Sequence, residues 1–319
     1  MPLKIVFCGT PSFALPTLRH LIAERDFKLA GVITQPDRPR GRGQELSSSP
    51  VKDAALEAGI SVYQPEKIKS ESAHDYFKRV APEVVVIIAY GQIIPASLLE
   101  IPRLGWINLH ESLLPKYRGA APINWAIVNG EKRTGLTTMR IDAGLDTGPI
   151  LMTHETTIGA DETAPELTAR LADAGAPLMV ETLRKLERGE MTPTPQDNSR
   201  ATPARPLKKE DGRMDFARSA RDLFNRLHGF QPWPGAFTIF KGKTLQVHRA
   251  QTVHTGSKLT PGEIVVEGTH LLVGCGKDKD PDAEGALELI ELQLEGKRRM
   301  SAQEFINGYR PKSGDHLGQ

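Results

Sequence analysis

Three polar side chains between residues 106 and 148 have the types that acyl transfer needs. Asn108 offers an amide N–H to an oxygen that gains negative charge, and His110 exchanges a proton near neutral pH. The carboxylate of Asp146 can hold an imidazole or take a proton. Ser112 is the nearest hydroxyl, but no sequence feature assigns a base to it. The set therefore predicts direct transfer between two bound substrates, without a covalent intermediate.

The elements that must position these residues follow from the pattern of apolar residues. Residues 4–8 and 29–34 read as strands on either side of a helix that Ser12 would cap, and this β-α-β order implies a parallel sheet. The continuous Val/Ile run at 83–90 predicts a central, fully buried strand. A strand at 106–110 places Asn108 and His110 on one face, and a strand at 135–141 leads into the Gly-rich turn around Asp146. A helix at 162–188 completes this part.

The second part of the chain has a different composition. Residues 192–206 hold four prolines and few apolar residues, which predicts a semi-rigid linker. From residue 236 on, five short strands separated by glycines predict a small antiparallel barrel, and Ser301 is expected to cap a final helix. We therefore expect a first domain at 1–190, a linker at 191–207 and a second domain at 208–319.

Length and composition exclude several classes of protein. The 319 residues are 39% hydrophobic and 25% charged, as in globular proteins with two domains. No apolar run is long enough for a membrane span and no charged-then-apolar leader opens the chain, so we expect a cytoplasmic protein that does not bind membranes. Cys8 and Cys275 are expected to be small buried hydrophobes, not parts of a metal or disulfide site. Nothing in the sequence demands more than a monomer.

Positive charge is concentrated in two places. Residues 200–249 contain eleven Lys or Arg against four Asp or Glu, while the whole chain carries a formal charge of only +2. Such asymmetry favours an anionic partner. Arg38, Arg40 and Arg42 alternate with Pro and Gly, which we interpret as a loop that is neither helix nor strand interior. From the residues alone, this loop is equally well a solvated surface or a phosphate grip.

The order Asn108-Leu109-His110, Ser112-Leu113-Leu114-Pro115 and then Asp146 in a Gly-rich loop resembles the signature of the folate-dependent formyltransferases. The resemblance covers almost the whole chain. Within that family the chain is similar to the members that act on initiator tRNA. The stretches that carry the resemblance are KIVFCGTPSFALPTL, TQPDRPRGRG, VVVIIAYGQIIP, NLHESLLPKYRGAAPINWAI, GLDTGPIL, KKEDGRMDF, FQPWPGAFT and KRRMSAQEFINGYR.

The resemblance implies a Rossmann-like parallel-sheet α/β domain followed by an OB-like antiparallel barrel. It implies transfer of formyl from 10-formyltetrahydrofolate to the α-amine of methionyl initiator tRNA, with Asn108, His110 and Asp146 as catalytic residues and no metal. The implied binding residues fall in two groups. Ser112, Leu113, Leu114, Pro115, Tyr90, Gly91 and Ile93 would hold the folate, and Arg38, Arg40, Arg42, Lys208 and Lys209 would contact the tRNA, with Arg42 the critical arginine.

Two departures from the family pattern and several rival functions stay open. Glu111 stands where the family usually has Gly or Ala and is expected to influence the protonation of His110; Phe216 stands where it usually has Trp. The main rival acceptor is a sugar-nucleotide amine, although we would not expect the DRPRGRG loop in such an enzyme. Glycinamide ribonucleotide as acceptor would leave the barrel unexplained. Hydrolysis of the formyl donor and non-catalytic RNA binding are two further rival functions.

Overall fold

The computed structural model describes residues 1–40, 45–255, 259–277 and 285–318. The chain forms two compact units. The first contains residues 1–122, 133–157 and 167–205, and the second contains 123–132, 158–166 and the chain from 206 on. The sequence pattern did not indicate that 123–132 and 158–166 belong to the second unit. The expected division at 1–190, 191–207 and 208–319 stays a prediction.

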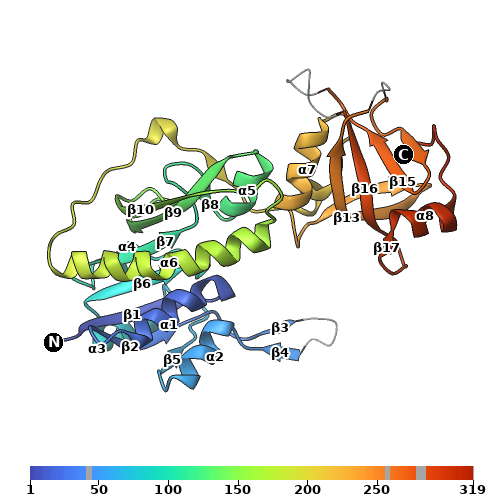
Figure 1. Ribbon diagram of the computed structural model, residues 1–319. Helices are drawn as coiled ribbons and strands as arrows, with labels where there is room; N and C mark the ends of the chain where they lie inside the picture. Colours follow the sequence, from blue (N-terminus) through green and yellow to red (C-terminus); the bar gives the residue numbers. More distant parts are fainter. Residues whose placement is uncertain (41–44, 256–258, 278–284, 319) are drawn as a thin grey trace. The chain divides into compact units, whose positions relative to one another are not determined.

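A seven-stranded sheet forms the centre of the first unit, in the order β10-β9-β7-β6-β1-β2-β5 (Figure 1). From β7 to β5 the neighbouring strands are parallel, while β9 and β10 extend the sheet in antiparallel orientation. Every residue of the Val/Ile-rich strand β6 is buried, so the predicted central strand and the Rossmann-like sheet are confirmed. The strands are β1 (Leu3–Gly9), β2 (Phe27–Ile33), β5 (Val62–Tyr63), β6 (Val84–Ile88), β7 (Trp106–His110), β9 (Arg133–Arg140) and β10 (Ile150–Thr157).

Helices cover both faces of this sheet. The long helix α6 runs along one face (Figure 1), and Gly175 lets it approach closely, because a Cβ there would lie 2.5 Å from Leu109 Cδ2. The predicted cap at Ser12 is wrong. Ser12 begins the 3-10 helix η1 (Ser12–Ala14), and the α-helix starts later, with Pro16 in its first turn. The helices are α1 (Leu15–Ala23), α2 (Pro50–Glu57), α3 (Glu71–Val80), α4 (Ala96–Leu99) and α6 (Ala164–Glu187).

The basic segment after β2 differs from our expectation. We expected a loop outside any strand, but β3 (Arg38–Arg40) pairs with β4 (Glu45–Ser47) in an antiparallel ribbon. Both strands of a two-stranded ribbon are edge strands, and an edge tolerates proline where the missing N–H would face outward. Pro39 therefore does not prevent the pairing. Arg42 lies outside the described residues.

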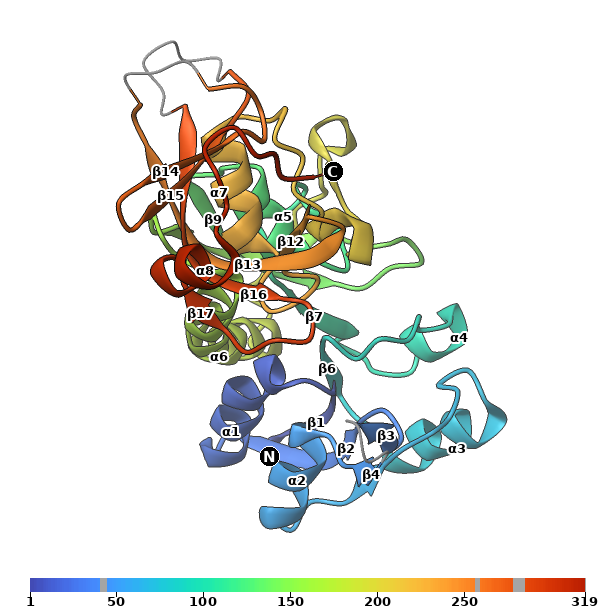
Figure 2. The same ribbon diagram turned by 90° about the vertical axis from the view of Figure 1, so that its right-hand side faces the viewer.

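The second unit contains an antiparallel sheet in the order β12-β13-β16-β15-β14, with β17 paired to β16. All five predicted strands are present. Helix α7 packs against β13, and α8 packs against β15 and β16 (Figure 2). Ser301 caps α8 as expected, in a capping box with Glu304. The elements are α5 (Pro122–Val128), η3 (Lys209–Gly212), α7 (Ala220–Gly229), β12 (Ala236–Phe240), β13 (Lys243–Val253), β14 (Ile264–Glu267), β15 (His270–Gly274), β16 (Ala286–Leu294), β17 (Met300–Ser301) and α8 (Ala302–Tyr309).

The C-terminal segment 313–318 joins the two edge strands of this sheet. Gly318 N donates to Ile239 O of β12 at 2.9 Å. At the other edge, Ile264 N of β14 donates to Asp315 O at 2.7 Å, and Gly314 N donates to Ile264 O at 2.9 Å. The tail thus occupies backbone groups that the edges of an open sheet would leave unpaired. It gives the antiparallel unit a barrel-like closure.

Residues 192–205, which we expected to form a linker, pack onto the first unit. Thr194 forms a bridge with Ile150, and β11 (Pro203–Ala204) pairs in parallel with β8 (Arg118–Gly119). Side chains in this stretch also bond to the loops after β7, as described below. A segment without apolar periodicity is therefore ordered by hydrogen bonds instead of by core packing.

Three further expectations concern simple features. Cys8 and Cys275 are both buried and free, as predicted. Within the described ranges, no helix has the length and apolar character that crossing a membrane requires. In the same ranges, no three His, Cys, Asp or Glu side chains are grouped as the ligands of a metal ion would be.

Candidate active site

Strand β7 carries the two central candidate residues at its C-terminal end. Asn108 pairs with Ile87 of β6 on one side and with Met139 of β9 on the other. His110 and Asn108 share a face of the strand, while Leu109, on the opposite face, is covered by α6. His110 is buried and Asn108 is half-buried. The carboxyl ends of adjacent parallel strands are the usual place for ligands in open α/β sheets.

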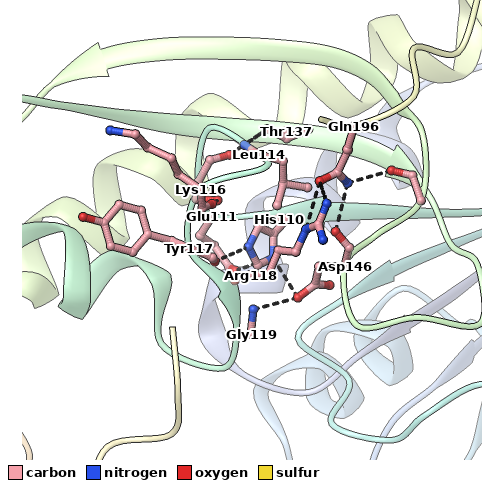
Figure 3. A network of polar contacts seen from close by, with 12 residues as sticks. His110, Glu111, Leu114, Lys116, Tyr117, Arg118, Gly119, Thr137, Asp146 and Gln196 are labelled. Carbon is pink, nitrogen blue, oxygen red and sulfur yellow. Dashed lines mark hydrogen bonds and ion pairs between the residues drawn. The ribbon is translucent and has the colours of Figure 1, made fainter. Parts of the chain in front are cut away.

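The imidazole of His110 is held in one orientation by a backbone carbonyl. Its Nε2 lies 2.9 Å from Tyr117 O (Figure 3). A carbonyl oxygen only accepts hydrogen bonds, so Nε2 carries a proton in both charge states of the ring. The nitrogen that gains or loses a proton is therefore Nδ1. Tyr117 itself has φ +60°, a conformation that residues with a side chain adopt rarely.

Asp146 faces this second nitrogen. Its Oδ2 lies 3.7 Å from His110 Nδ1 and accepts a hydrogen bond from Gly119 N at 2.9 Å (Figure 3). The backbone bond fixes the direction of the carboxylate. Asp146 has φ +52°, in the left-handed region, which aspartate adopts more readily than most residues with a side chain.

Glu111 brings a second carboxyl group to the same nitrogen. Its Oε2 lies 4.0 Å from His110 Nδ1, and 18% of its side chain is exposed. Burial raises the pKa of Glu111, and this effect exceeds the opposing attraction of His110. The imidazole therefore has two acidic neighbours of different character. Asp146 is anchored by a backbone N–H, and Glu111 resists ionisation.

Gln196 holds the Asp146 loop in place. Its Nε2 donates to Asp146 O at 2.9 Å and to Gly148 O at 2.7 Å. Its Oε1 accepts from Arg118 Nε at 3.1 Å and Nη2 at 2.8 Å (Figure 3). Arg118 also donates to Asn198 Oδ1 at 2.8 Å. The amide of Gln196 thus connects the Asp146 loop to Arg118. The next residue, Gly119, binds the Asp146 carboxylate.

The SLLP segment folds around the hydroxyl of Thr137. This hydroxyl donates to Ser112 O at 2.7 Å and accepts from Leu114 N at 3.1 Å. Ser112 is fully buried, and its own hydroxyl donates to Lys116 O at 2.6 Å. A serine engaged in this way is a structural residue, in accord with the expectation of direct transfer. Leu113 and Pro115 are half-buried and Leu114 is buried.

The loop after β6 lies at the same end of the sheet. Tyr90 is buried, and its carbonyl accepts from Gln35 Nε2 at 2.9 Å. Gly91 has φ +87°, which turns the chain directly after the strand. Ile93 is 89% exposed, although most large apolar side chains of this unit are buried. An exposed isoleucine beside a glycine turn is compatible with contact to a flat apolar ligand.

The candidate tRNA contacts fall in both units. Arg38 belongs to the first, and its guanidinium lies 3.4 Å from Glu66 on the surface. Arg40 ends β3, and Arg42 lies outside the described residues. Lys208 and Lys209 belong to the second unit and are exposed at the start of η3.

The chain matches known proteins along almost its entire length. The family model described as formyl transferase matches residues 3–183, and the one described as formyl transferase, C-terminal domain, matches residues 206–310. A methionyl-tRNA formyltransferase of Koribacter versatilis is 54% identical over 99% of this chain and 98% of its own length. One of Solibacter usitatus is 50% identical over 99% of both chains.

The chain belongs to the methionyl-tRNA formyltransferase family.

Solved structures that share the fold are more distant. The sugar 3N-formyl transferase WlaRD, solved in the presence of dTDP and 5-N-formyl-THF, has a TM-score of 0.67 at 19% identity and covers 93% of this chain and 100% of its own. Glycinamide ribonucleotide transformylase 1 from Symbiobacterium toebii has a TM-score of 0.51 at 19% identity, over 61% of this chain and 95% of its own. At this identity the likeness concerns the fold.

Three groups around the site of this formyltransferase family member were not found from the sequence. Thr137 is the register partner of His110 in the sheet. A threonine in an otherwise buried strand is a weak sign of a polar role, and it could have indicated Thr137 as part of the site. Gln196 lies in a stretch that reads as a linker and has no such signal. The Tyr117 carbonyl is a backbone group, so no residue type could indicate it.

Proposed function

We propose that this chain transfers the formyl group of 10-formyltetrahydrofolate to the α-amine of methionine esterified to initiator tRNA. The observation that carries the proposal is the convergence of His110 Nδ1 and the Asp146 carboxylate, 3.7 Å apart, at the carboxyl end of β7. Membership of the methionyl-tRNA formyltransferase family, at 54% identity to one member, supports the acceptor. The fold shared with folate-dependent enzymes supports the donor.

The reaction proceeds by direct attack of the neutral amine on the formyl carbon. A C–N bond forms and the carbonyl oxygen becomes an oxyanion, to which Asn108 and protonated His110 donate. Since Nε2 is bonded to Tyr117 O, the donor from the imidazole is Nδ1. The amine proton passes to the Asp146 carboxylate, directly or through water, and then to N10 of the folate. The bond from the formyl carbon to N10 breaks, which releases tetrahydrofolate and formylated tRNA.

The proposed role of Asp146 is narrower than the sequence suggested. We expected Asp146 both to orient His110 and to relay a proton. Tyr117 O already fixes the ring at 2.9 Å, whereas Asp146 Oδ2 lies 3.7 Å from Nδ1. The proposed function of Asp146 is therefore to stabilise the imidazolium and to move the proton.

The folate and the tRNA are proposed to use different surfaces. Backbone groups of 90–93 and 112–115, with the side chains of Ile93, Leu113 and Pro115, would hold the folate near β6 and β7, while the buried side chains of Tyr90, Ser112 and Leu114 would shape these two loops. Arg38, Arg40, Arg42, Lys208 and Lys209 would contact phosphates, so the affinity for tRNA should fall as salt rises. We further propose that the protein acts as a monomer in the cytoplasm, where charged initiator tRNA is found.

The test is formylation of charged initiator tRNA with 10-formyltetrahydrofolate, beside the same assay with a sugar-nucleotide amine. Asn108→Ala should lower kcat about a hundred- to a thousandfold, the loss expected for one oxyanion donor. Arg42→Ala should lower kcat/KM for tRNA, while Arg19→Ala, which removes an exposed arginine of α1, should not. Transfer to the sugar amine with no activity on tRNA would refute the acceptor. An Asn108→Ala enzyme with wild-type kcat would refute the site.

A further inference from the structure

An exposed tryptophan borders a hollow on the second unit. The hollow has a volume of about 490 Å³ and includes Trp233, Phe237 and Lys209 in its lining. Trp233 is 54% exposed, whereas Trp106 is 1% exposed in the core of the first unit. Exposure of an indole costs free energy in the absence of a partner, because so much apolar surface remains in water. This hollow has no place in the mechanism described above.

The floor of the hollow is the outward face of three strands. Phe237 of β12 is the register partner of Gln246 of β13, and Gln246 is the register partner of Gln293 of β16. Neighbours in register on one face lie about 5 Å apart, so these side chains form a continuous row. The row combines one aromatic ring with two side-chain amides. Gln293 uses its amide within the protein, because its Oε1 lies 3.1 Å from His248 Nε2 and its Nε2 donates to Lys297 O at 2.9 Å. The amide of Gln246 is therefore the one proposed to meet a ligand, and an amide can both donate and accept.

The wall that holds Trp233 is rigid. Prolines precede and follow it, and each fixes its own φ. The turn that contains them lies against η3, because a Cβ on Gly212 would come within 2.4 Å of Gly235 O. Met214 N donates to Phe237 O at 2.8 Å and attaches the end of this segment to β12. Lys209, at the start of η3, is thereby held on the same rim as Trp233.

These groups match the chemistry of one unpaired nucleotide. Flat bases stack on aromatic rings in proteins that bind single-stranded nucleic acid, and cations contact the phosphates. Side-chain amides recognise the edges of a base that is not paired. The hollow lies in the size range of small-ligand pockets, about 300–1,000 Å³. Among the described residues of its lining, Glu295 is the only one with a carboxylate, and its Oε2 accepts a hydrogen bond from Thr244 N at 3.1 Å and is thus directed to the backbone.

The surface continues beyond Phe237 in a way that suits a nucleic acid strand. A second hollow of about 700 Å³ shares Phe237 and Gln246 with the first and extends along β13 to Arg249 and Arg299. Acidic side chains are present there too, and Glu291 lies 3.9 Å from Arg299. The described lining of the second hollow also includes the acidic side chains of Asp161, Glu166 and Glu291, so the nucleotide site is argued from the first hollow.

We propose that the hollow at Trp233 binds one unpaired nucleotide of the tRNA substrate, with its base stacked on the indole and its phosphate toward Lys209. This inference rests on the proposed tRNA substrate and adds a specific contact to it. The stack positions the RNA on the antiparallel unit and makes no contact with the reacting atoms. Its removal therefore weakens productive binding of tRNA.

The first measurement is tryptophan fluorescence during titration with a short single-stranded oligoadenylate. Stacking on an indole quenches its emission, so wild type should show quenching that Trp233→Phe lacks. The result that overturns the proposal is equal quenching in both proteins, or none in wild type. Quenching by an oligoproline peptide and not by the oligoadenylate would also overturn it, in favour of a polypeptide partner.

The second measurement is kcat/KM for charged initiator tRNA. Loss of one stacked base should lower kcat/KM roughly 5- to 150-fold in Trp233→Ala, and by a smaller factor in Trp233→Phe, which keeps an aromatic ring. Lys209→Ala, which alters only an exposed side chain, should also lower it, and the matched control Leu56→Ala, at 55% exposure, should not. Wild-type kcat/KM in both Trp233→Ala and Lys209→Ala overturns the inference. Failure of wild type to formylate tRNA is a different outcome, which overturns the proposed function.

Discussion

The hydrogen bonds of Gln196 lead to a quantitative prediction about the Asp146 loop. Gln196→Ala removes two bonds from its Nε2, to Asp146 O and Gly148 O, and two to Arg118. The two bonds to the loop are worth about 0.5–1.5 kcal/mol each, or about 1–3 kcal/mol together. Loss of the bonds therefore favours loop conformations in which the carboxylate faces away from His110.

Because about 1.4 kcal/mol is tenfold in a population, kcat/KM should fall roughly 5- to 150-fold in Gln196→Ala. The assay is steady-state formylation of charged initiator tRNA, with a thermal midpoint recorded for each variant. Gln196→Glu is more specific than Gln196→Ala, since it keeps an acceptor for Arg118. It removes only the N–H groups that donate to the carbonyl oxygens of Asp146 and Gly148. It should lose at least as much activity as Gln196→Ala.

Asn198→Ala is the matched control, because it removes one hydrogen bond to Arg118 and none to the loop. Its activity should stay within about threefold of wild type. If Gln196→Glu retained wild-type kcat/KM, the loop would not depend on this amide and the reasoning would fail. Equal losses in Asn198→Ala and Gln196→Ala would instead assign the effect to Arg118.

Three further changes have expected outcomes. Burial raises the pKa of Glu111 above its ordinary value of 4.5, so the folded state favours the protonated carboxyl. The free energy of unfolding therefore falls as pH rises through the raised pKa. Glu111→Gln, which stays neutral, should raise the thermal midpoint at pH 8 and leave it unchanged below about pH 4. A Cβ on Gly148 would lie 1.8 Å from Arg140 O, so Gly148→Ala should lower formylation by about tenfold or more. Gly285→Ala serves as the control, because no described residue has an atom within 4 Å of a Cβ placed there. Ending the chain at Lys312 removes four backbone bonds at the sheet edges, worth about 2–6 kcal/mol, which should lower the urea midpoint and increase light scattering; an unchanged midpoint would show that the tail does not stabilise the unit.

Periodicity was sufficient to predict the elements that have a single, strong pattern. The Val/Ile run of β6 and the alternating strand β12 are examples, because burial on both faces or on one face produces a regular pattern of apolar residues. The pair Asn108 and His110 was placed on one strand face by the same reasoning. Their residue types indicated acyl-transfer chemistry, and the resemblance assigned them their catalytic roles.

Contacts between distant segments without periodicity could not be predicted. Gln196 and Asp146 are fifty residues apart in stretches rich in Pro, Gly and polar residues, so neither residue type indicates a partner. The pairing of β3 with β4 was excluded by a rule about strand interiors that does not hold for a two-stranded ribbon. The hydrogen bond between His110 Nε2 and Tyr117 O depends on a backbone turn at Tyr117 with φ +60°, and the presence of a tyrosine does not indicate such a turn.

The short ladder between β8 and β11 restricts how this chain can be divided or recombined. Ala204 O accepts from Ala120 N at 2.8 Å, and a side chain at Gly119 would meet that oxygen at 2.6 Å. Gly119 N is also the group that binds Asp146. A fragment that ended at residue 190 would keep Asn108, His110 and Asp146. It would lose β11, which pairs with the backbone of Arg118 and Gly119 beside them. Chimaeras that exchange the second unit between relatives should therefore be joined after Arg205, because residues 191–205 belong to the first unit and help to build the candidate site.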